Sequence, residues 1–519
     1  MVSAKWSLIF PLLSGVLLWL SLPGGGELWP LLFVALVPLL FLIPGSSVKE
    51  AALYGFLFGL VHFLLLLYWI VIVLGRYGGL HWSVAALALL LLAIYLGSYY
   101  LIFALAARCI FPVFPAAVVL WLLPALWVGL DWLRGILFTG MPWMDLGYGL
   151  WQQTGLIQIA DLFGHHGLTW LIVFSNCLAV ILLTKKQSPA GAVALLLSSL
   201  FVYGGAAVYS RVRVGEVSRA LSATGLKTVR VGIVQGNIDQ SIKWSPPQQR
   251  STVERYLTLS EQLLTDNPPQ LLVWPETALP FYPRKNKNMG LLRDALSRYQ
   301  TALLTGAPWY EIIDLNGQKK IEFFNSALLL ESDGRIGGKY YKNHLVPFGE
   351  YIPLKKFLPF LAPVVEAVGD FSPGSIERPL IAGDGRLGVL ICFESVFPNL
   401  SRQWILAGAN MLVNLTNDAW YGKSSAPHQS LAMSVFRAVE TRRSLVRSAN
   451  TGISAFISPL GRVESSSLLF QPYAAAGDVV LLETETFWVR FGYLFAPLCL
   501  LAGMVGVVVA VMREKEVQE

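Results

Sequence analysis

The side chain best suited to nucleophilic chemistry is Cys392, which ends the short apolar run 387–392 and precedes a polar turn. Such a run is typical of a buried strand, and open α/β sheets carry reactive side chains at the carboxyl ends of their strands. The other three cysteines, Cys109, Cys177 and Cys499, lie within long apolar stretches. Taken alone, this pattern fits a buried, inert cysteine as well as a nucleophile.

Two charged residues follow or interrupt apolar segments in a similar way. Glu276 comes directly after the apolar stretch 270–274, and Lys342 lies in the Pro- and Gly-punctuated segment 340–351. A single glutamate at such a place usually caps a helix, and a single lysine usually extends to the surface. Together with Cys392, however, they supply what is needed to activate a thiol, protonate a leaving group and hold a tetrahedral oxyanion.

These residues lie in a part of the chain where strand and helix patterns alternate, which predicts an α/β domain. Strands are expected at 229–235, 270–274, 301–306, 325–331, 387–392, 410–415, 445–449 and 453–458, and helices at 247–266, 288–299, 397–407 and 428–443.

The composition indicates an integral membrane protein that also has a water-exposed part. Of the 519 residues, 55% are hydrophobic and only 14% are charged, whereas an ordinary soluble domain has about 25% charged residues. The net charge of +7 is not concentrated in a basic cluster interleaved with aromatic residues. No nucleic-acid partner is therefore expected.

Eight stretches without Asp, Glu, Lys or Arg are long enough to cross the hydrocarbon core, for which about 20 residues suffice. They are 6–26, 28–48, 51–75, 77–107 (with its helix expected at 83–105), 109–130, 162–184, 187–210 and 491–512. We therefore expect a membrane domain at 1–210 with seven helices, a linker at 211–227, a catalytic domain at 228–480 and an eighth helix at 491–512. The first stretch lacks a small-x-small cleavage site at Leu22-Pro23-Gly24, so it is expected to remain as an anchor.

Basic residues in short loops favour the cytoplasmic side of a membrane. With the N-terminus inside, the cytoplasmic set is Lys5, Lys49, Arg108, Lys185, Lys186, Arg513 and Lys515, against Arg76 and Arg134 on the other side. This bias predicts that both termini are cytoplasmic and that 211–490 lies outside the cytoplasm.

Polar residues of the membrane domain are expected to have structural roles. Asp131 and Arg134 are three residues apart near a helix end, where an ion pair is favoured. The aromatic-rich connection 134–160 is expected at the membrane interface. His62, His165 and His166 show no metal-ligand spacing, and no metal or cofactor is expected.

Four motifs carry a family resemblance. They are Gln235-Gly236-Asn237-Ile238 with Lys243-Trp244, Trp274-Pro275-Glu276-Thr277, Lys342-Asn343-His344-Leu345-Val346-Pro347-Phe348-Gly349-Glu350, and Asn417-Asp418-Ala419-Trp420-Tyr421-Gly422. The segment 228–480 resembles the nitrilase superfamily. Over nearly its full length, the chain resembles the apolipoprotein N-acyltransferases, a membrane-embedded branch of that superfamily.

The resemblance implies an αββα sandwich with a Glu–Lys–Cys triad. Matched by position, Glu276 is the general base, Lys342 the oxyanion stabiliser and Cys392 the nucleophile, and Glu350 and Glu394 support them.

Three aromatic residues are implied to bind substrate. Trp244 matches a tryptophan of a substrate-gating loop, and Trp420 lies in the last motif. Phe393 stands where the family often has tyrosine, so this chain has no hydroxyl at that position.

The implied reaction moves the sn-1 acyl chain of a phospholipid to Cys392 and then to the α-amine of a diacylglyceryl-cysteine at a lipoprotein N-terminus. The implied location is the bacterial inner membrane, with the catalytic domain on the periplasmic side and the lipid bilayer as a partner. A membrane-anchored nitrilase-type amidase that acts on a small C–N substrate is the main alternative, because a triad alone does not distinguish acyl acceptors. A lipid-binding or lipoprotein-escort protein without catalytic activity is a third.

The segment 353–371 is an apolar insertion with two lysines. It is expected either to pack on the core or to form a lid at the membrane surface through Phe357, Phe360 and Leu361.

Overall fold

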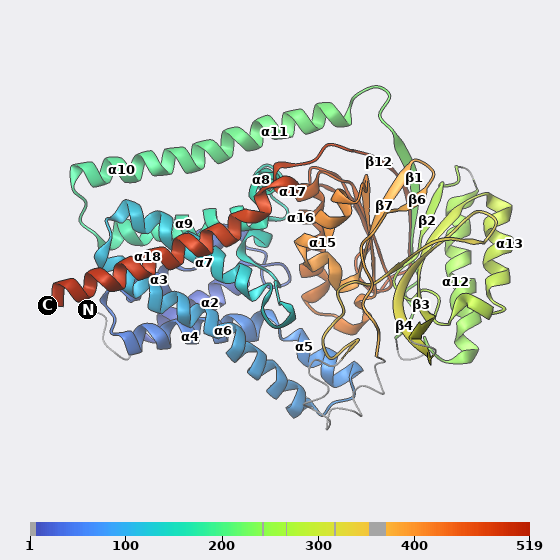
Figure 1. Ribbon diagram of the computed structural model, residues 1–519, viewed down its shortest axis with the longest axis horizontal. Helices are drawn as coiled ribbons and strands as arrows, with labels where there is room; N and C mark the ends of the chain where they lie inside the picture. The colour runs from blue at the N-terminus through green and yellow to red at the C-terminus, as the bar shows by residue number, and fades with distance from the viewer. Residues whose placement is uncertain (1–6, 241–242, 266, 316–317, 352–369, 519) are drawn as a thin grey trace. The chain divides into compact units, whose positions relative to one another are not determined.

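The computed structural model describes residues 7–240, 243–265, 267–315, 318–351 and 370–518 (Figure 1). The chain forms two compact units. The helical unit comprises Met1–Glu216, Ser424–Phe436 and Thr486–Glu519, and the sheet unit comprises Val217–Lys423 and Arg437–Glu485. The residues 353–369 of the expected lid, including Phe357, Phe360 and Leu361, lie outside the described residues.

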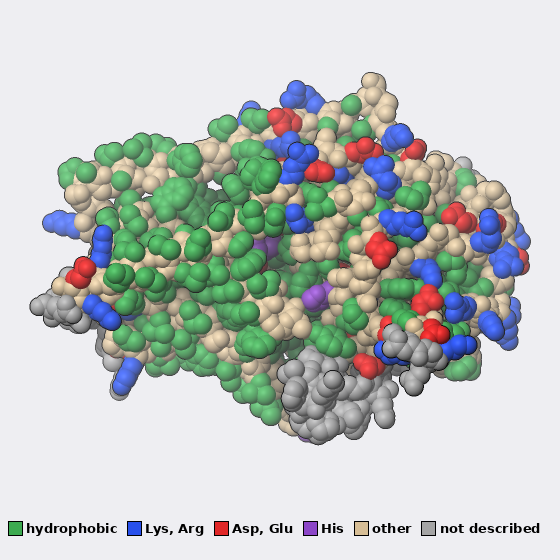
Figure 2. All heavy atoms as spheres, viewed as in Figure 1, with side chains coloured by type: hydrophobic (Ala, Val, Ile, Leu, Met, Phe, Trp, Pro, Cys, Tyr) green, Lys and Arg blue, Asp and Glu red, His purple; other side chains and the backbone are tan. Residues whose placement is uncertain are grey.

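Six helices within the described residues are long and apolar enough to cross a membrane. They are α4 (Val48–Leu66), α6 (Trp82–Val113), α7 (Ala116–Arg134), α9 (His165–Thr184), the continuous helix Pro189–Leu221 that contains α10 (Pro189–Ser199) and α11 (Gly205–Leu221), and Gly492–Glu516, most of which is α18 (Phe495–Gln518). Figure 2 shows hydrophobic side chains dominating the visible surface of this unit, as expected for helices that face lipid.

The first two predicted spans fold as shorter apolar helices. Residues 6–26 contain α2 (Ile9–Ser21), and 28–48 contain the broken helix Trp29–Gly45. Prolines explain the breaks in the second, because Pro30, Pro38 and Pro44 each stand at the start of a separate short helix.

Two other helices differ from their predicted limits. The helix predicted at 83–105 is α6, which extends to Val113 and contains Pro112 one residue before its end. The helix that begins at Pro189 continues to Leu221, through the first part of the predicted linker.

Small residues bring the long helices of this unit close together. A Cβ atom on Gly59 of α4 would lie 2.7 Å from the Cα of Gly97 in α6, and one on Gly129 of α7 would lie 2.5 Å from the Cα of Leu500 in α18. Helices in lipid have no hydrophobic driving force for association, so close van der Waals packing of this kind helps to hold them together.

The sheet unit contains two six-stranded sheets. In spatial order the first is β12 (Tyr473–Val480), β1 (Thr228–Gln235), β2 (Leu271–Val273), β3 (Ala302–Leu315), β4 (Gln318–Leu330) and β5 (Ile336–Tyr341). The second is β11 (Val463–Ser466), β10 (Ala455–Ile457), β9 (Leu445–Ala449), β8 (Met411–Thr416), β7 (Gly385–Ile391) and β6 (Leu380–Ala382).

All eight predicted strands are present, and β5, β6, β11 and β12 were not predicted. The four predicted helices are α12 (Pro246–Leu264), α13 (Met289–Tyr299), α15 (Pro398–Leu406) and α16 (Ala426–Thr441). In Figure 1, α12 and α13 lie beside the first sheet and α15 beside the second. The sheets are joined by Ser448 of β9, whose hydroxyl donates to the carbonyl oxygen of Val273 at 3.1 Å.

Candidate active site

The carboxylate of Glu276 lies just beyond the carboxyl end of β2. The chain turns sharply there, since Thr277 has φ +52°. The turn packs directly on β3, where a Cβ atom on Gly306 would lie 2.3 Å from the Thr277 nitrogen. Glu276 is 7% exposed, so its carboxylate is held in a largely dry position.

Lys342 follows β5 and is the buried cation of the site. Its Nζ lies 2.9 Å from Glu350 Oε1 and 3.8 Å from Glu276 Oε1. Burial lowers the pKa of Lys342, but the carboxylates of Glu350 and Glu276 outweigh burial and raise it above its ordinary value. The ammonium therefore stays charged at neutral pH.

An amide links the two carboxylates. Asn325 of β4 donates from Nδ2 to Glu276 Oε1 at 2.8 Å and to Glu350 Oε1 at 2.7 Å. The backbone carbonyl oxygen of Asn325 also accepts the backbone N–H of Lys342 at 2.9 Å. Asn325 thereby fixes both carboxylates and the lysine backbone, and the sequence analysis did not select it. The available signal was a single amide within the apolar run 323–330.

Cys392 stands at the junction of β7 and a short 3₁₀ helix, Cys392–Val396. Its φ of +52° places a residue with a side chain in the left-handed region, a conformation that stores strain. This sharp strand-to-helix turn resembles the geometry that exposes nucleophiles at the ends of strands in other α/β enzymes.

The surroundings of Cys392 keep its thiol protonated at rest. Burial, followed by the negative charge of Glu276, raises the pKa of Cys392 to about 12, against the opposing effect of Lys342. A thiolate is therefore not formed in advance. Glu276 is the carboxylate whose charge acts on both Cys392 and Lys342.

Glu394 connects the turn at Cys392 to the segment after Lys342. One carboxylate oxygen accepts the backbone N–H of Ile391 at 2.6 Å. The other accepts the backbone N–H groups of Asn343 at 2.6 Å and His344 at 3.1 Å, and the hydroxyl of Tyr340 at 2.8 Å. Burial raises the pKa of Glu394 to about 7. Glu394 thus contacts backbone N–H groups and the Tyr340 hydroxyl, and these bonds hold the two segments together.

The three predicted substrate-binding residues differ in exposure. Phe393 is buried, with its ring centroid 5.0 Å from that of Phe397. Trp244 and Trp420 are 48% and 38% exposed.

Lys243, next to Trp244, is a second buried cation. Its Nζ donates to the carbonyl oxygen of Glu276 at 3.4 Å, and burial lowers its pKa to about 8. The motif that contains it was noted in the sequence, but this approach to Glu276 was not predicted.

The helical unit holds a separate buried ionic cluster. The predicted pair of Arg134 and Asp131 is confirmed, with a nitrogen–oxygen distance of 3.5 Å. Arg134 also contacts Asp145, whose other oxygen lies 2.7 Å from His165 Nε2 and 3.5 Å from His166 Nε2. The two histidines thus converge on a carboxylate that their spacing in the sequence did not reveal. A guanidinium on the same carboxylate supplies the positive charge that a metal ion would bring.

The aromatic residues of the connection 134–160 differ in burial. Trp143 and Tyr148 are 1% and 0% exposed, and Trp143 donates from Nε1 to Gln429 at 2.7 Å. Phe138 is 84% exposed. The position of this connection at the membrane interface stays a prediction.

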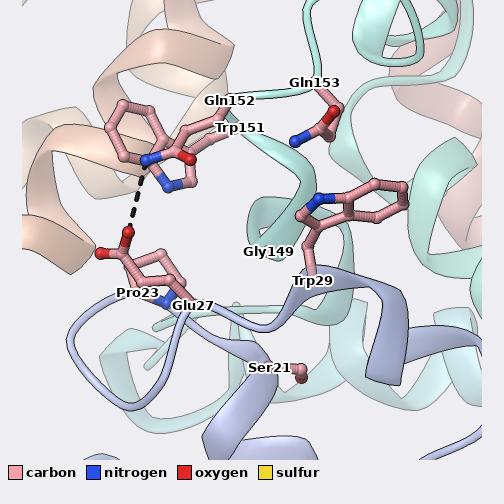
Figure 3. Close-up of a pocket in the computed structure, with 8 residues that line it drawn as sticks. All are labelled: Ser21, Pro23, Glu27, Trp29, Gly149, Trp151, Gln152 and Gln153. Atoms are coloured by element: carbon pink, nitrogen blue, oxygen red, sulfur yellow. Dashed lines mark hydrogen bonds between the residues drawn. The ribbon is translucent and has the colours of Figure 1, made fainter.

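A hollow in the helical unit is lined by Ser21, Pro23, Glu27, Trp29, Gly149, Trp151, Gln152 and Gln153 (Figure 3). Gln152 donates from Nε2 to Glu27 there at 3.3 Å. Glu276, Lys342 and Cys392 are not among its lining residues.

Comparisons with known proteins agree with the two-part organisation. Residues 14–178 match the model of the apolipoprotein N-acyltransferase N-terminal domain, and residues 230–467 match that of the carbon-nitrogen hydrolases. The chain is 40% identical to an apolipoprotein N-acyltransferase of Geobacter metallireducens, covering 98% of this chain and 96% of the relative. It is 33% identical to one of Methylococcus capsulatus, covering 90% and 89%. Among solved structures, a carbon-nitrogen hydrolase from Helicobacter pylori G27 is similar with a TM-score of 0.36 and 18% identity, covering 52% of this chain and 92% of that one.

Proposed function

Because this chain belongs to the apolipoprotein N-acyltransferase family, we propose that its sheet unit transfers an acyl chain through a thioester on Cys392. The donor is a membrane phospholipid, and the acceptor is the α-amine of a diacylglyceryl-cysteine at a lipoprotein N-terminus. The observation that carries the proposal is the buried network of Lys342 with Glu276 and Glu350, beside a strained cysteine.

In the first half-reaction, Cys392 Sγ attacks the ester carbonyl while Glu276 accepts the thiol proton. A general base is needed because the pKa of Cys392 is raised to about 12. The ester C–O bond then breaks, and Glu276 returns the proton to the departing alkoxide, which leaves as the lysophospholipid.

The tetrahedral intermediate carries a negative oxygen, which we place against the Lys342 ammonium and the backbone N–H of Phe393. Lys342 is suited to this role because Glu350 and Asn325 fix its position and its raised pKa keeps it charged. Preorganised donors of this kind stabilise charge that develops only in the transition state.

In the second half-reaction, the neutral amine attacks the thioester and Glu276 accepts one amine proton. The C–S bond breaks and the proton passes to the sulfur, which restores the thiol and releases the amide. The same oxyanion donors act in both halves.

Both substrates are embedded in lipid, which accounts for the attachment of a hydrolase-like unit to so many apolar helices. We propose eight transmembrane segments, in which the two short apolar helices complete the count, and a periplasmic sheet unit with both termini cytoplasmic. The exposed residue Lys287 allows a test. A cysteine at this position should react with a membrane-impermeant maleimide in intact spheroplasts. Reaction only after lysis would invert the topology.

The competing function is an amidase for small C–N substrates. The match of residues 14–178 to the N-terminal domain of the acyltransferases favours acyl transfer, since a single anchor would suffice for a soluble substrate. The two functions can be distinguished by isolating the acyl-enzyme and incubating separate portions of it with different acceptors. The proposal predicts rapid loss of the acyl group to a diacylglyceryl-cysteine peptide and slow loss to water or ammonia. Equal rates with all three would favour the amidase.

A further inference from the structure

A second polar chain lies beside the nucleophile, on the opposite side of β7 from the edge strand β6. β7 and β8 are parallel, and their register pairs Ile391 with Leu415. The next residues along the two strands are Cys392 and Thr416, so they are neighbours across a spacing of about 4.8 Å. Thr416 is 1% exposed.

Thr416 begins a continuous buried hydrogen-bond chain. Its hydroxyl donates to Asp418 Oδ1 at 2.8 Å, and Asp418 Oδ2 accepts from Arg447 Nη2 at 2.9 Å. Arg447 in turn donates to Asn414 of β8 and, at 3.1 Å, to the carbonyl oxygen of Ile453. Asp418 and Arg447 are 1% and 0% exposed. The chain is therefore held on strand ends of the second sheet, apart from the Lys342 network.

The hydroxyl of Thr416 has a single proton, and two acceptors compete for it. While Cys392 carries its proton, the hydroxyl can donate to Asp418 and accept from the S–H group. When the sulfur loses its proton, the hydroxyl gains by turning its own proton toward the anionic sulfur, because charge-assisted hydrogen bonds are the stronger ones. Asp418 keeps Arg447 as a donor in that state, so its carboxylate is not left unpaired.

We propose that Thr416 is a catalytic residue that stabilises the sulfur of Cys392 as an anion, by switching its hydroxyl from Asp418 to the sulfur. The switch serves both half-reactions, since the sulfur is anionic as it attacks the ester and again as it leaves the thioester. This inference deepens the proposed function and rests on Cys392 being the nucleophile.

The electrostatics of the site agree with this geometry. Burial and Glu276 raise the pKa of Cys392, and Asp418 adds to the rise, whereas Lys342 and the hydrogen bond from Thr416 lower it. The charged and titratable groups facing the sulfur are thus Glu276 after β2, Lys342 after β5, and Asp418 and Tyr421 after β8.

The test measures how fast iodoacetamide alkylates Cys392 in the full-length protein, followed by intact mass at pH 8.5, below the pKa of about 12. In this range the rate follows the thiolate fraction, so a rise of one unit in the thiol pKa slows alkylation about tenfold. Thr416→Val keeps the shape of the side chain but removes the hydroxyl, and it should slow alkylation about 10- to 100-fold, the range for a hydrogen bond to a charged group. Thr416→Ser restores the hydroxyl and should recover most of the rate.

Asp418→Asn provides a second variant with an effect of opposite sign. It removes a negative charge that raises the thiol pKa, so alkylation should become faster rather than slower. Equal rates for the wild type and Thr416→Val, or an equal loss in the Val and Ser variants, would overturn the role of Thr416. Slower alkylation of Asp418→Asn would also contradict the switch, whether or not Thr416→Val folds. If wild-type Cys392 forms no acyl adduct with phospholipid, the proposed nucleophile itself is wrong.

Discussion

The two units of this protein each bury an ionic cluster, but we propose a catalytic role for only one of the two clusters. In the helical unit, Arg134 lies against Asp131 and Asp145, and His165 completes the pairing of Asp145. In the sheet unit, Lys342 lies against Glu276 and Glu350. Both sets of charges are almost fully buried.

The difference lies in what each cluster faces. Lys342 and Glu276 stand beside a cysteine whose backbone is strained and whose thiol is held protonated. The Arg134 cluster has no cysteine among its described contacts, and its carboxylate is already occupied by a guanidinium and a histidine. Burial of charge alone therefore does not identify an active site. In the sheet unit the buried charges stand beside a strained cysteine with a raised pKa, and this combination is the reason for proposing an active site there.

The largest expected effect concerns the cation of the sheet unit. Lys342→Met removes the charge while keeping the length of the side chain, and it should lower the transfer rate about 100- to 1000-fold. Steady-state transfer to a diacylglyceryl peptide measures the loss. Lys287→Met, the same change at an exposed lysine, should retain the wild-type rate. A Lys342→Met variant with more than about a tenth of the rate, outside the range for an oxyanion donor, would make this lysine structural.

A smaller effect on the transfer rate is expected from Glu350, the carboxylate that contacts Lys342. Glu350→Gln weakens a charge-assisted hydrogen bond to Lys342 and should lower the rate about 10- to 100-fold. The same substitution should also shift the pH dependence of the transfer rate in a defined direction. Glu350 raises the pKa of Lys342, so without it the ammonium loses its proton at lower pH and the alkaline limit of activity should move downward.

The pH–rate profile of Glu350→Gln checks this shift, with Glu254→Gln on the exposed face of α12 as its control. An unchanged alkaline limit would show that Glu350 does not hold the charge on Lys342.

The smallest effect on chemistry is expected in the helical unit. Arg134→Met leaves Asp145 buried without its guanidinium and should destabilise the protein by about 3–5 kcal/mol. Its thermal unfolding temperature should fall, whereas Arg211→Met, at an exposed arginine, should leave it unchanged. The alkylation rate of Cys392 per folded molecule should stay within about twofold of the wild type, the ordinary range for substitutions that act independently. If Arg134→Met instead slowed alkylation of Cys392 without lowering the unfolding temperature, the two clusters could not be divided into a structural and a catalytic one.

The sequence predicted most of the strands and helices because their apolar runs are bounded by Gly, Pro and polar residues. It missed β12, whose Ala474-Ala475-Ala476-Gly477 run lacks the β-branched and aromatic residues typical of strands. It also predicted 28–48 as one span without revealing that prolines divide it into short helices, since absence of charge does not show a break in a helix.

The candidate site was predicted only as far as single motifs allow. Glu276, Lys342 and Cys392 each end a recognisable segment, and the resemblance assigned their roles. Asn325 and Thr416 act through strand pairing, because β4 places Asn325 beside Lys342 and β8 places Thr416 beside Cys392. The register between strands that are far apart in the chain cannot be predicted from the sequence of either strand. These partners were therefore identified only from the structure.

One measurement tests the central claim most directly, which is that Cys392 carries the acyl chain. The purified protein is incubated with a phospholipid of defined acyl chains and no acceptor, and its intact mass is recorded before and after treatment with neutral hydroxylamine, which cleaves thioesters. The wild type should gain the mass of one acyl group that hydroxylamine removes, with release of lysophospholipid, and Cys392→Ala should gain none. An adduct of equal yield in Cys392→Ala, or one mapped to another residue, would contradict the account.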